Sequence, residues 1–575
     1  KTAIQVLKYL QDNNLFFHKE NYNHTYPHCW RCKTPLIYYA RDSWYIGMSK
    51  LRDKLVAENQ KINWEPAHIR EGRFGEWIRE VKDWAISRER YWGTPLPIWL
   101  ADDGDKIVVD GFDTLKKYTK KSGNKYFVMR HGGTEGNLKE LVSFKDQAGD
   151  HLTEKGKQQV RSEVGHYKNE IDLIICSPFT RTHETAQIAK DELNVEAEII
   201  VDERLHEINP GIYDGKNWHD YHDYIYKSGS GWFDRPIPEG ESLRDVQKRI
   251  GEFLYEIEEK YKEKNILIIT HGGPAWLFFV NAGLFTPENK EYHVANTHAF
   301  AAEFKRFQNA EIRELPFVPL PHNENYELDP HRPFIDEVIL EKDGKEYKRV
   351  KEVMDVWFDS GAMPFAQDHY PFQNKEWVEG AGYPGDFISE AIDQTRGWFY
   401  TLLAVGVLMG RGTPYKNVIC LGHLLDAEGK KMSKSIGNIV DPWVMMDRYG
   451  VDVLRTWMFS VNQPGDSKNF DEKTVKEVEG KVFTLFYNVL SFYELYRDKE
   501  LEIHLTPTPL LAKERGETQS GERSVLDQWI LARLNQTIKT MTETMDAYKL
   551  MEPVRELREF IGDLSTWYLR RSRDR

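Results

Sequence analysis

The chain has 575 residues, of which 40% are hydrophobic and 29% charged, an ordinary balance for a protein of several domains with buried cores. The formal net charge of −13 argues against a protein that coats nucleic acid over its whole surface, although a local basic face remains compatible with it. No apolar run approaches the ~20 residues that span a bilayer, so we expect no membrane partner. Four cysteines in this length argue against a disulfide scaffold and favour a reducing cytoplasm.

The two ends of the chain fall inside helical patterns. It opens on Lys1-Thr2-Ala3-Ile4, without an initiator methionine or a secretory leader, and it stops at Arg575. We therefore expect an internal piece of a longer protein. As a separate expectation, the protein is a monomer.

Two cysteines near the start have the spacing of half a zinc site. They are Cys29 and Cys32 in the stretch 26–38. A closed structural zinc site needs four ligands, and the other cysteines, Cys176 and Cys420, stand far away. Two interpretations stay open: a zinc site completed from elsewhere, or a reduced and packed turn.

The next stretch, 63–99, is rich in tryptophan and arginine. Its tryptophans are expected to anchor a core or an interface: Trp77, Trp84, Trp92 and Trp99. Its arginines either contact RNA phosphate or are ordinary exposed and ion-paired side chains: Arg73, Arg88 and Arg90.

Residues 124–309 read as a separate α/β domain. Its strand-like runs each end in polar residues, and in doubly wound sheets ligands collect at the carboxyl ends of the strands. The runs are 125–129, 172–176 and 265–270, and the polar strings that follow are Arg130-His131-Gly132, Ser177-Pro178-Phe179-Thr180-Arg181 and His271-Gly272-Gly273. Two histidines and two arginines are thus predicted to converge.

These side chains predict phosphoryl chemistry. A neutral His131 can attack phosphorus and become phosphohistidine. Arg130 and Arg181 offer planar forks for the phosphate oxygens. His271 adds a donor, and Glu207 can protonate the leaving oxygen. The alternative for a single histidine after a strand is a structural role.

Beyond this domain, Trp357 and Trp398 stand near a group of polar residues. Aromatic walls suit a branched aliphatic guest, but the two tryptophans taken alone favour core packing over a pocket. Glu390, Asp393 and Gln394 lie within roughly one helical turn and are expected to share a face.

A glycine-bounded loop then carries two lysines. Lys431 and Lys434 stand between Gly429 and Gly437. Mobile ammonium groups suit a leaving group that gains negative charge, such as pyrophosphate departing from ATP. Taken alone, such a loop is usually a solvated turn.

The remainder is predicted to be helical. A polar stretch, 506–522, is expected to be a loop. It precedes apolar residues at helical spacing: Leu526, Ile530, Leu534, Ile538, Met541 and Met545.

These strings outside the middle domain resemble class I isoleucyl-tRNA synthetases. The matching words are PHCWRCKTPLIY at 27–38, DWAISRERYWG at 83–93, DVWFDSG at 355–361, EAIDQTRGWF at 390–399, KMSKS at 431–435 and DLSTWYLRRSR at 563–573. The resemblance implies that Trp357 and Trp398 hold the isoleucine side chain, and that Glu390, Asp393 and Gln394 face the α-amino group and the adenylate. It implies ATP contacts from Gly422, His423, Lys431, Met432, Ser433, Lys434 and Ser435, with tRNA contacts from Arg570, Arg571 and Arg573. Lys431 and Lys434 would be catalytic.

The middle domain resembles the histidine phosphatase, or phosphoglycerate mutase-like, superfamily. The opening 130–137 matches RHGxTxxN, 152–156 matches LTxxG and 240–242 matches GES. Gly133 departs from the Glu of many members, which leaves the subfamily open. The resemblance supports His131, Arg130, Arg181, Glu207 and His271 as catalytic residues acting on an unknown phosphorylated substrate.

Together these features predict an α/β fold. It has a Rossmann-like synthetase core, a three-layer α/β/α histidine phosphatase insert and a truncated helical anticodon-binding bundle. The expected segments are the end of an editing and connective insertion (1–60), connective region (61–123), insert (124–309), return linker (310–345), catalytic half (346–460) and stem-contact and anticodon helices (461–575).

The expected function is that of an isoleucine–tRNA ligase using Mg-ATP, isoleucine and tRNA(Ile). No HIGH motif occurs in the chain, so we expect these 575 residues alone to form adenylate poorly. Two alternatives stay open for the insert: a phosphatase that is the working activity of the chain, or a non-catalytic docking module.

Overall fold

The fold is described from a computed structural model. It describes residues 2–20, 22, 24–29, 32–37, 39–89, 92–142, 144, 150–226, 233–284, 307–433, 437–497 and 524–573. Residues 1–45 form one compact unit and 46–575 a second. The first unit contains α1 (Thr2–Asp12) and a turn in which the Cys29 N–H donates to the Thr34 carbonyl at 2.8 Å.

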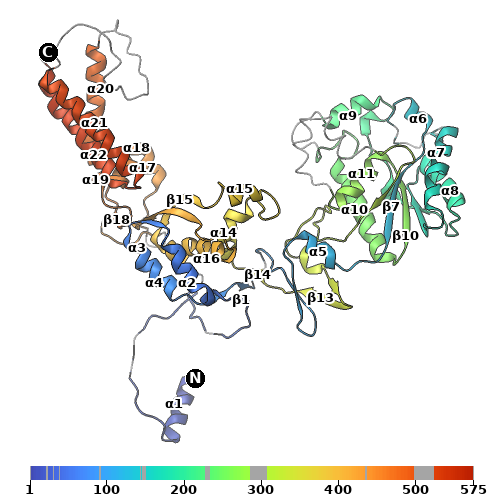
Figure 1. Cartoon of the computed structure of the whole chain (residues 1–575), viewed down its shortest axis with the longest axis horizontal. Helices are drawn as coiled ribbons and strands as arrows, with labels where there is room; N and C mark the ends of the chain where they lie inside the picture. The colour runs from blue at the N-terminus through green and yellow to red at the C-terminus, as the bar shows by residue number, and fades with distance from the viewer. Residues whose placement is uncertain are drawn as a thin grey trace. The chain divides into compact units, whose positions relative to one another are not determined.

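The middle domain is built on a five-stranded sheet of order β11-β7-β10-β8-β9 (Figure 1). The central strands are parallel, and β11 runs antiparallel to β7. The predicted strand-like runs thus become strands as expected, while β11 extends the sheet past residue 309. The strands are β7 (Lys125–Arg130), β8 (Leu173–Cys176), β9 (Ile200–Val201), β10 (Asn265–Thr270) and β11 (Ile312–Leu315).

Helices cover both faces of this sheet (Figure 1). The apolar alternation of β7 explains why, since Tyr126 and Val128 join the core under α10 and α11, whereas Phe127 and Met129 join the core under α7 and α8. Each fully buried side chain of this size contributes about 1.5–3 kcal/mol. The helices are α6 (Glu135–Leu138), α7 (Glu154–Val164), η2 (Gly165–Tyr167), α8 (Thr180–Leu193), η3 (Glu203–Leu205), η4 (Gly211–Tyr213), α9 (Trp218–Tyr226), α10 (Leu243–Lys260) and α11 (Gly272–Asn281).

Helix α10 also holds the segments that enter and leave the domain. The buried Glu258 carboxylate accepts from the Ser122 N–H and hydroxyl at 2.8 and 2.7 Å and from the Tyr126 hydroxyl at 2.6 Å. One turn earlier, the Tyr255 hydroxyl donates to the Leu320 carbonyl at 2.8 Å. The segments that enter and leave the domain are therefore both hydrogen-bonded to the same helix.

Residues on either side of the insertion meet in a four-stranded sheet of order β12-β13-β5-β6. The buried Trp99 indole donates to the Val338 carbonyl at 2.8 Å, as expected for a core anchor. Trp92 is not a core anchor, because it is 74% exposed and stacks on His331. The elements are β5 (Ile98–Leu100), β6 (Lys106–Val108), α5 (Phe112–Tyr118), η5 (Phe334–Glu337), β12 (Leu340–Lys342) and β13 (Lys345–Arg349).

A parallel three-stranded sheet of order β15-β16-β2 carries the region around Trp357 and Trp398. Its core packs Trp64 against Phe74 and Phe399, with ring centroids 4.8 and 5.8 Å apart. The elements are β1 (Tyr45–Ile46), η1 (Met48–Leu51), α2 (Arg52–Asn59), β2 (Asn63–Glu65), α3 (His68–Glu71), α4 (Arg73–Arg79), β3 (Trp84–Ala85), β4 (Ser87–Arg88), β14 (Val353–Met354), α14 (Val356–Ala366), α15 (Lys375–Glu379), β15 (Gly385–Ala391), η6 (Ile392–Arg396), α16 (Trp398–Leu408) and β16 (Tyr415–Leu421).

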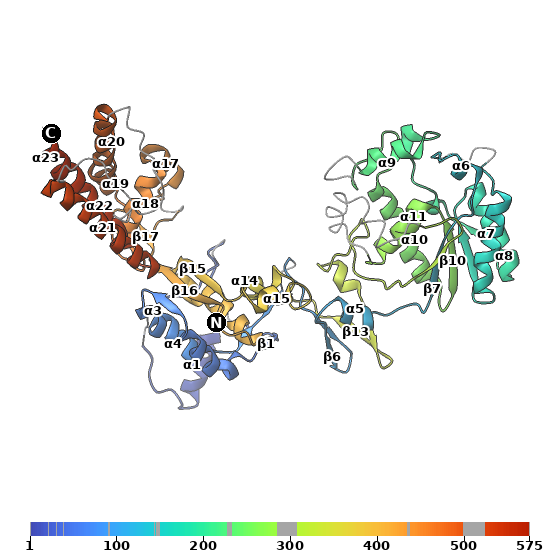
Figure 2. The same ribbon diagram turned by 45° about the horizontal axis from the view of Figure 1, so that its top comes forward.

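The C-terminal region is helical, as expected, and α21 runs beside α22 (Figure 2). The half-buried Arg533 of α21 ties them together through Glu556 and, at 2.9 Å, through Asp563. The predicted loop 506–522 lies outside the described residues. The elements are β17 (Leu424–Leu425), α17 (Pro442–Tyr449), α18 (Val451–Ser460), β18 (Lys468–Asn469), α19 (Glu472–Val478), η7 (Glu479–Phe483), α20 (Thr484–Tyr496), α21 (Val525–Asp546), α22 (Met551–Gly562), η8 (Asp563–Leu569) and α23 (Arg570–Ser572).

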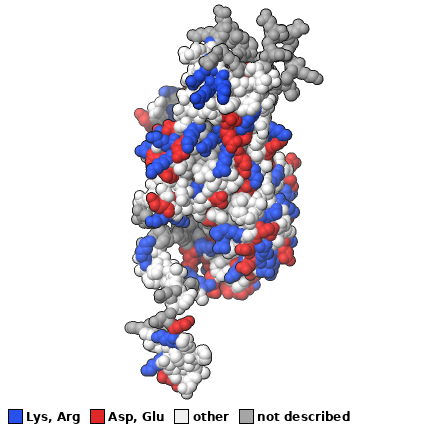
Figure 3. Space-filling view, turned by 90° about the vertical axis from the view of Figure 1, so that its left-hand side faces the viewer, with Lys and Arg blue, Asp and Glu red and all other residues white. Residues whose placement is uncertain are grey.

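Acidic and basic side chains are mixed over the face shown in Figure 3, in keeping with the moderate negative charge. Within the described part of the chain, no helix combines the length and the apolar character that a membrane crossing requires.

Candidate functional site

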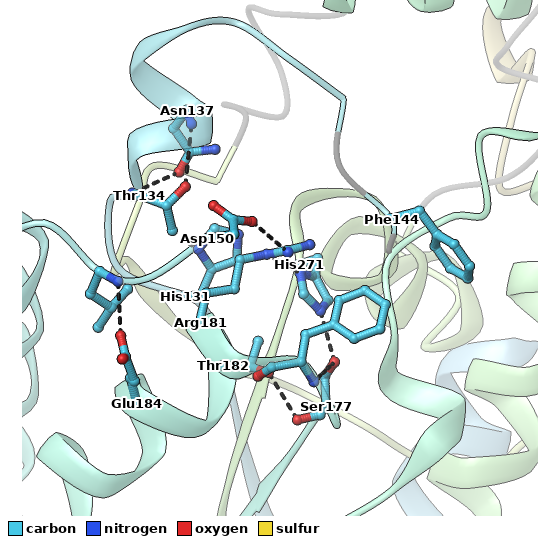
Figure 4. A network of polar contacts seen from close by, with 12 residues as sticks. His131, Thr134, Asn137, Phe144, Asp150, Ser177, Arg181, Thr182, Glu184 and His271 are labelled. Carbon is cyan, nitrogen blue, oxygen red and sulfur yellow. Dashed lines mark hydrogen bonds and ion pairs between the residues drawn. The ribbon is translucent and has the colours of Figure 1, made fainter. Parts of the chain in front are cut away.

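Four predicted residues of the middle domain come together at the carboxyl edge of its sheet. Arg130 ends β7 and His131 follows it, Arg181 lies in the first turn of α8, and His271 caps α11 after β10 (Figure 4). The two imidazole centroids are 5.3 Å apart. The N-termini of α8 and α11 face this edge, and helix N-termini favour anions.

His131 is held in its neutral form. Its Nδ1 lies 2.8 Å from the Gly132 carbonyl oxygen, which can only accept, so Nδ1 carries the proton and Nε2 keeps a lone pair. The side chain is 3% exposed. Burial, together with the charges of Arg181 and Arg130, holds the pKa of His131 well below its usual range.

His271 is fixed by two protein partners. The Arg181 Nε donates to its Nδ1 at 3.3 Å, so its Nε2 carries the proton and donates to the Ser177 hydroxyl at 2.8 Å. Burial and the charge of Arg181 hold its pKa well below the usual range. Both ring nitrogens are thus engaged, and a bond from His271 to phosphate would replace one of these contacts.

Asp150 is a functional candidate that sequence reasoning misses. Its Oδ2 accepts from the Arg181 Nη1 at 2.7 Å, with side chains only 9% and 4% exposed (Figure 4). The pair orients the guanidinium whose Nε reaches His271. No periodicity singles out this residue, and only its place just before the LTxxG string could have suggested it.

The local structure explains several residues of the LTxxG and GES motifs. A Cβ on Gly156 would lie 2.1 Å from the Gly133 carbonyl, so α7 can approach the loop after His131 only with glycine at 156. Ser242 caps α10 in a capping box with Asp245. Glu241 accepts from the Asn209 N–H at 2.8 Å, which ties the GES turn to the loop of the predicted acid.

Glu207 lies at the N-terminus of α11, on the same edge of the sheet. Its Oε1 accepts from the Ile208 N–H at 3.0 Å and would lie 2.8 Å from a Cβ built on Gly273. Arg130 donates through Nη1 to the Phe307 carbonyl at 2.9 Å. A buried neutral histidine, arginines and a carboxylate at one edge can transfer a phosphoryl group.

The depressed pKa values predict the titration of the two histidines. We expect the imidazole carbon signals of His131 and His271 to keep their neutral positions from pH 7.5 down to pH 5.5, below the ordinary pKa of about 6.5. NMR on histidine-labelled protein, with signals assigned from His131→Ala and His271→Ala, measures this. A titration midpoint at or above pH 6.5 would contradict the neutral nucleophile.

The buried pair predicts a stability effect. Asp150→Ala leaves the Arg181 charge buried without its partner, which costs about 3–5 kcal/mol of unfolding free energy. The matched control is Glu154→Ala, because the Glu154–Lys157 pair has a similar 2.8 Å separation but is 85% and 34% exposed, and exposed pairs contribute little to stability. Urea unfolding followed by a probe in the middle domain measures both; equal losses would contradict the assignment.

The second group of predicted residues lies at the carboxyl ends of β15 and β16. Asp393 and Gln394 follow β15 in η6, while Gly422 and His423 follow β16. The Gly422 N–H donates to Pro464 at 2.7 Å, and the His423 carbonyl accepts from Lys468 at 2.9 Å. Ligands of parallel sheets bind at such ends.

Trp357 and Trp398 flank the same glycine. A Cβ on Gly397 would lie 3.1 Å from the Trp357 ring, and Trp398 follows directly. The Gln394 side-chain oxygen accepts from the Trp398 N–H at 2.9 Å. Trp357 is 42% exposed, which leaves its ring available as a wall.

Glu390 does not share a helix face with Asp393 and Gln394. It lies in β15, paired in parallel register with Cys420 of β16, whereas the other two lie in the short helix η6. The expectation of one helical turn was therefore wrong, because the hydrogen bonds of the parallel ladder extend the backbone through 391.

The lysine loop is clasped by Asp426 and Asn438. The Asn438 amide donates to Asp426 at 2.8 Å, and its oxygen accepts from the Ser433 N–H at 2.9 Å. The hydrogen bond from the Asn438 amide, together with that from the Lys430 N–H, holds the pKa of Asp426 below its usual range. Lys431 is exposed and Met432 half-buried, while Lys434 and Ser435 lie outside the described residues.

The predicted tRNA contacts and the cysteine pair occupy surfaces. Arg570, Arg571 and Arg573 are exposed, and Arg571 lies over Trp567. The Cys32 thiol is hydrogen-bonded to the Thr34 hydroxyl, and this contact lowers the pKa of the thiol to about 7. Within the described residues, no group of three or more His, Cys, Asp or Glu side chains is placed to hold a metal ion.

Comparison with known families assigns the parts of the chain to domain families. The model of the tRNA synthetases class I (I, L, M and V) matches residues 5–143 and 306–471. The chain belongs to this class I synthetase family. The histidine phosphatase superfamily (branch 1) matches 126–313 inside it, and the anticodon-binding domain of tRNA ligase matches 527–575. The chain is thus a class I synthetase segment with an inserted histidine phosphatase domain, as expected.

Curated relatives of this synthetase segment are named as isoleucine–tRNA ligases. That of Clostridium novyi (strain NT) is 31% identical over all of this chain and 35% of its own length. That of Thermobifida fusca (strain YX) is 30% identical over 98% of this chain and 34% of its own. The chain therefore spans about a third of these relatives. A solved putative alpha-ribazole-5'-P phosphatase of Escherichia coli str. K-12 substr. MG1655 is 24% identical over 29% of this chain and 83% of its own, with a TM-score of 0.25.

Proposed function

We propose that the synthetase segment belongs to an isoleucine–tRNA ligase. In the whole protein, the isoleucine carboxylate attacks the α-phosphorus of ATP, which arrives with Mg²⁺ as its substrate complex. Pyrophosphate leaves, and the isoleucyl group passes from the adenylate to the terminal adenosine of tRNA(Ile). Lys431 and Lys434 stabilise the negative charge that builds up on the departing phosphates.

The placement of Trp357 and Trp398 on either side of Gly397 supports this proposal best. Two aromatic walls at the end of β15 suit a branched aliphatic side chain, and the polar Gln394 beside them suits an amino group. The test is isoleucine-dependent ATP–pyrophosphate exchange by the whole protein. The kcat/KM of exchange with isoleucine should exceed that with valine by roughly 10–200-fold. Exchange driven equally well by leucine or methionine would overturn the assignment.

We propose a second activity, phosphomonoester hydrolysis, for the inserted domain. The His131 Nε2 attacks phosphorus, the bond to the leaving oxygen breaks, and Glu207 gives that oxygen its proton. Water, deprotonated by Glu207, then attacks the phosphohistidine and releases inorganic phosphate. Arg130 and Arg181 hold the equatorial oxygens throughout.

The buried tautomer of His131 supports this second activity, because a spacer or docking module has no physical need for a neutral histidine between two arginines. The test is turnover of p-nitrophenyl phosphate by the 575-residue chain, with rapid quenching to trap the acid-labile phosphohistidine. Turnover without phosphate on His131 would overturn the nucleophile, and absence of turnover would favour the docking module.

A further inference from the structure

An aromatic cluster adjoins the phosphate site. The ring centroids of Phe179 and His271 are 5.2 Å apart. The Arg181 guanidinium lies 5.0 Å from the centroid of the Phe179 ring. Phe179 also contacts Phe144 and His206, with ring centroids 5.6 and 6.4 Å away. The centroids of the Phe144 and His206 rings are 5.3 Å apart. All three rings are half-buried, so each keeps exposed surface (Figure 4 labels Phe144).

The cluster stands on the side of the proton donor. His206 directly precedes Glu207, and its Nδ1 donates to the Glu207 carbonyl at 2.7 Å, which fixes the ring. A group that protonates the leaving oxygen must lie beside the leaving group. The aromatic cluster formed by Phe144, Phe179 and His206 is therefore placed where the organic part of a substrate projects.

Two further arginines near Glu207, Arg249 and Arg204, are already paired with carboxylates. Arg249, whose Nη2 donates to the Glu207 carbonyl at 3.2 Å, binds Glu241 at 3.0 Å. Arg204 binds Asp202 at 2.8 Å and Glu256 at 2.7 Å. Of the described residues, these two arginines would have to give up their carboxylate partners to bind a leaving group with a second negative charge, whereas a flat apolar group can stack on the three rings.

We propose that the aromatic cluster is a leaving-group subsite, and that the inserted domain acts on phosphomonoesters of flat, aromatic alcohols. The inference rests on the proposed phosphatase activity. Ring stacking against such a leaving group contributes beyond simple area burial. Removal of one ring should therefore change the choice between substrates and leave the phosphate contacts intact.

The experiment compares benzyl phosphate with ethyl phosphate and 3-phosphoglycerate, using the full 575-residue chain. Benzyl phosphate should have a kcat/KM roughly tenfold above the other two. Phe144→Ala and Phe144→Leu should each lower the benzyl value by about 5–10-fold and leave the ethyl value within about twofold. Leu138→Ala is the matched control, because it removes an apolar side chain that is 72% exposed on α6 and lies outside the cluster.

Binding of benzylphosphonate and ethylphosphonate, measured by calorimetry, separates the two proposals. If no ester turns over but benzylphosphonate binds more tightly and loses that advantage in Phe144→Leu, the subsite stands and the phosphatase activity falls. Equal kcat/KM for benzyl and ethyl phosphate, equal binding of the two phosphonates, or a preference for 3-phosphoglycerate would overturn the subsite.

Discussion

Replacing His131 by alanine should abolish the proposed aryl phosphate hydrolysis, with an expected loss of at least about 10³-fold in kcat. In the proposed route the imidazole Nε2 supplies the lone pair that attacks phosphorus, because Nδ1 is committed to the Gly132 carbonyl. We do not expect the neighbouring His271 to replace it, since both ring nitrogens of His271 are already hydrogen-bonded, to Arg181 and Ser177. The measurement is p-nitrophenyl phosphate turnover at pH 7.

Two controls accompany this variant. Leu138→Ala, at the exposed position on α6, should turn over like the parent chain. Circular dichroism should show that His131→Ala keeps its secondary structure, since the β7 backbone bonds do not involve the imidazole. Unchanged turnover in a folded His131→Ala would refute the nucleophile, and the whole phosphohistidine route with it.

Replacing Lys431 by alanine in the whole protein should lower isoleucine-dependent pyrophosphate exchange by roughly 10²–10³-fold. The Asp426–Asn438 clasp holds the backbone on either side of the lysines, and Gly429 and Gly437 turn with φ of +77° at both ends of the loop. The loop therefore has fixed ends and an exposed ammonium group at Lys431. That group is needed only when pyrophosphate departs, so kcat should fall more than KM rises.

Lys430→Ala is the matched control, because it removes the same charge one residue earlier in the same loop. Lys430 contributes its backbone N–H to Asp426, and that bond survives the substitution. Its exchange rate should stay within about threefold of the parent, as expected for a solvated surface charge. Equal losses in the two variants would show that general loop charge, and not a placed ammonium group, assists the reaction.

A further measurement asks whether the two sites communicate. Charging of tRNA(Ile) by the whole protein, with and without His131→Ala, answers it. Equal charging would make the phosphatase an independent second activity, whereas a change with folding intact would mean that the inserted site feeds back on aminoacylation.

Much of the middle domain could be predicted from the sequence, because its strands are short and apolar and each is followed directly by polar side chains of the kind found in active sites. The residues after β7, β8 and β10 were expected to converge, and they do. Asp150 could not be predicted in this way. It reaches Arg181 across the fold, and a contact between residues 31 apart in the chain leaves no periodic trace.

Boundaries and local geometry were less predictable. The sequence predicted that Glu390 lies on one helical turn with Asp393 and Gln394. In the structure its backbone is extended, because it pairs in parallel with β16. The last strand of the middle domain, β11, carries charged residues at Arg313 and Glu314 between its buried ends. Such a strand becomes visible only once β7 provides an edge on which it can pair.

The hydrogen bonds from the entering and leaving segments to α10 bear on how one domain can be inserted into another. The Lys120 N–H donates to the Ile339 carbonyl at 2.9 Å, so the stems of the insertion already touch where they leave the host sheet. To the surrounding synthetase, the entire domain is then topologically a wide hairpin loop. Loop-closure entropy grows only by about 0.6 kcal/mol for each doubling of length, and a folded passenger with adjoining ends lowers even that cost. The entropic cost of inserting the whole domain into the synthetase fold is therefore little more than that of an ordinary surface turn.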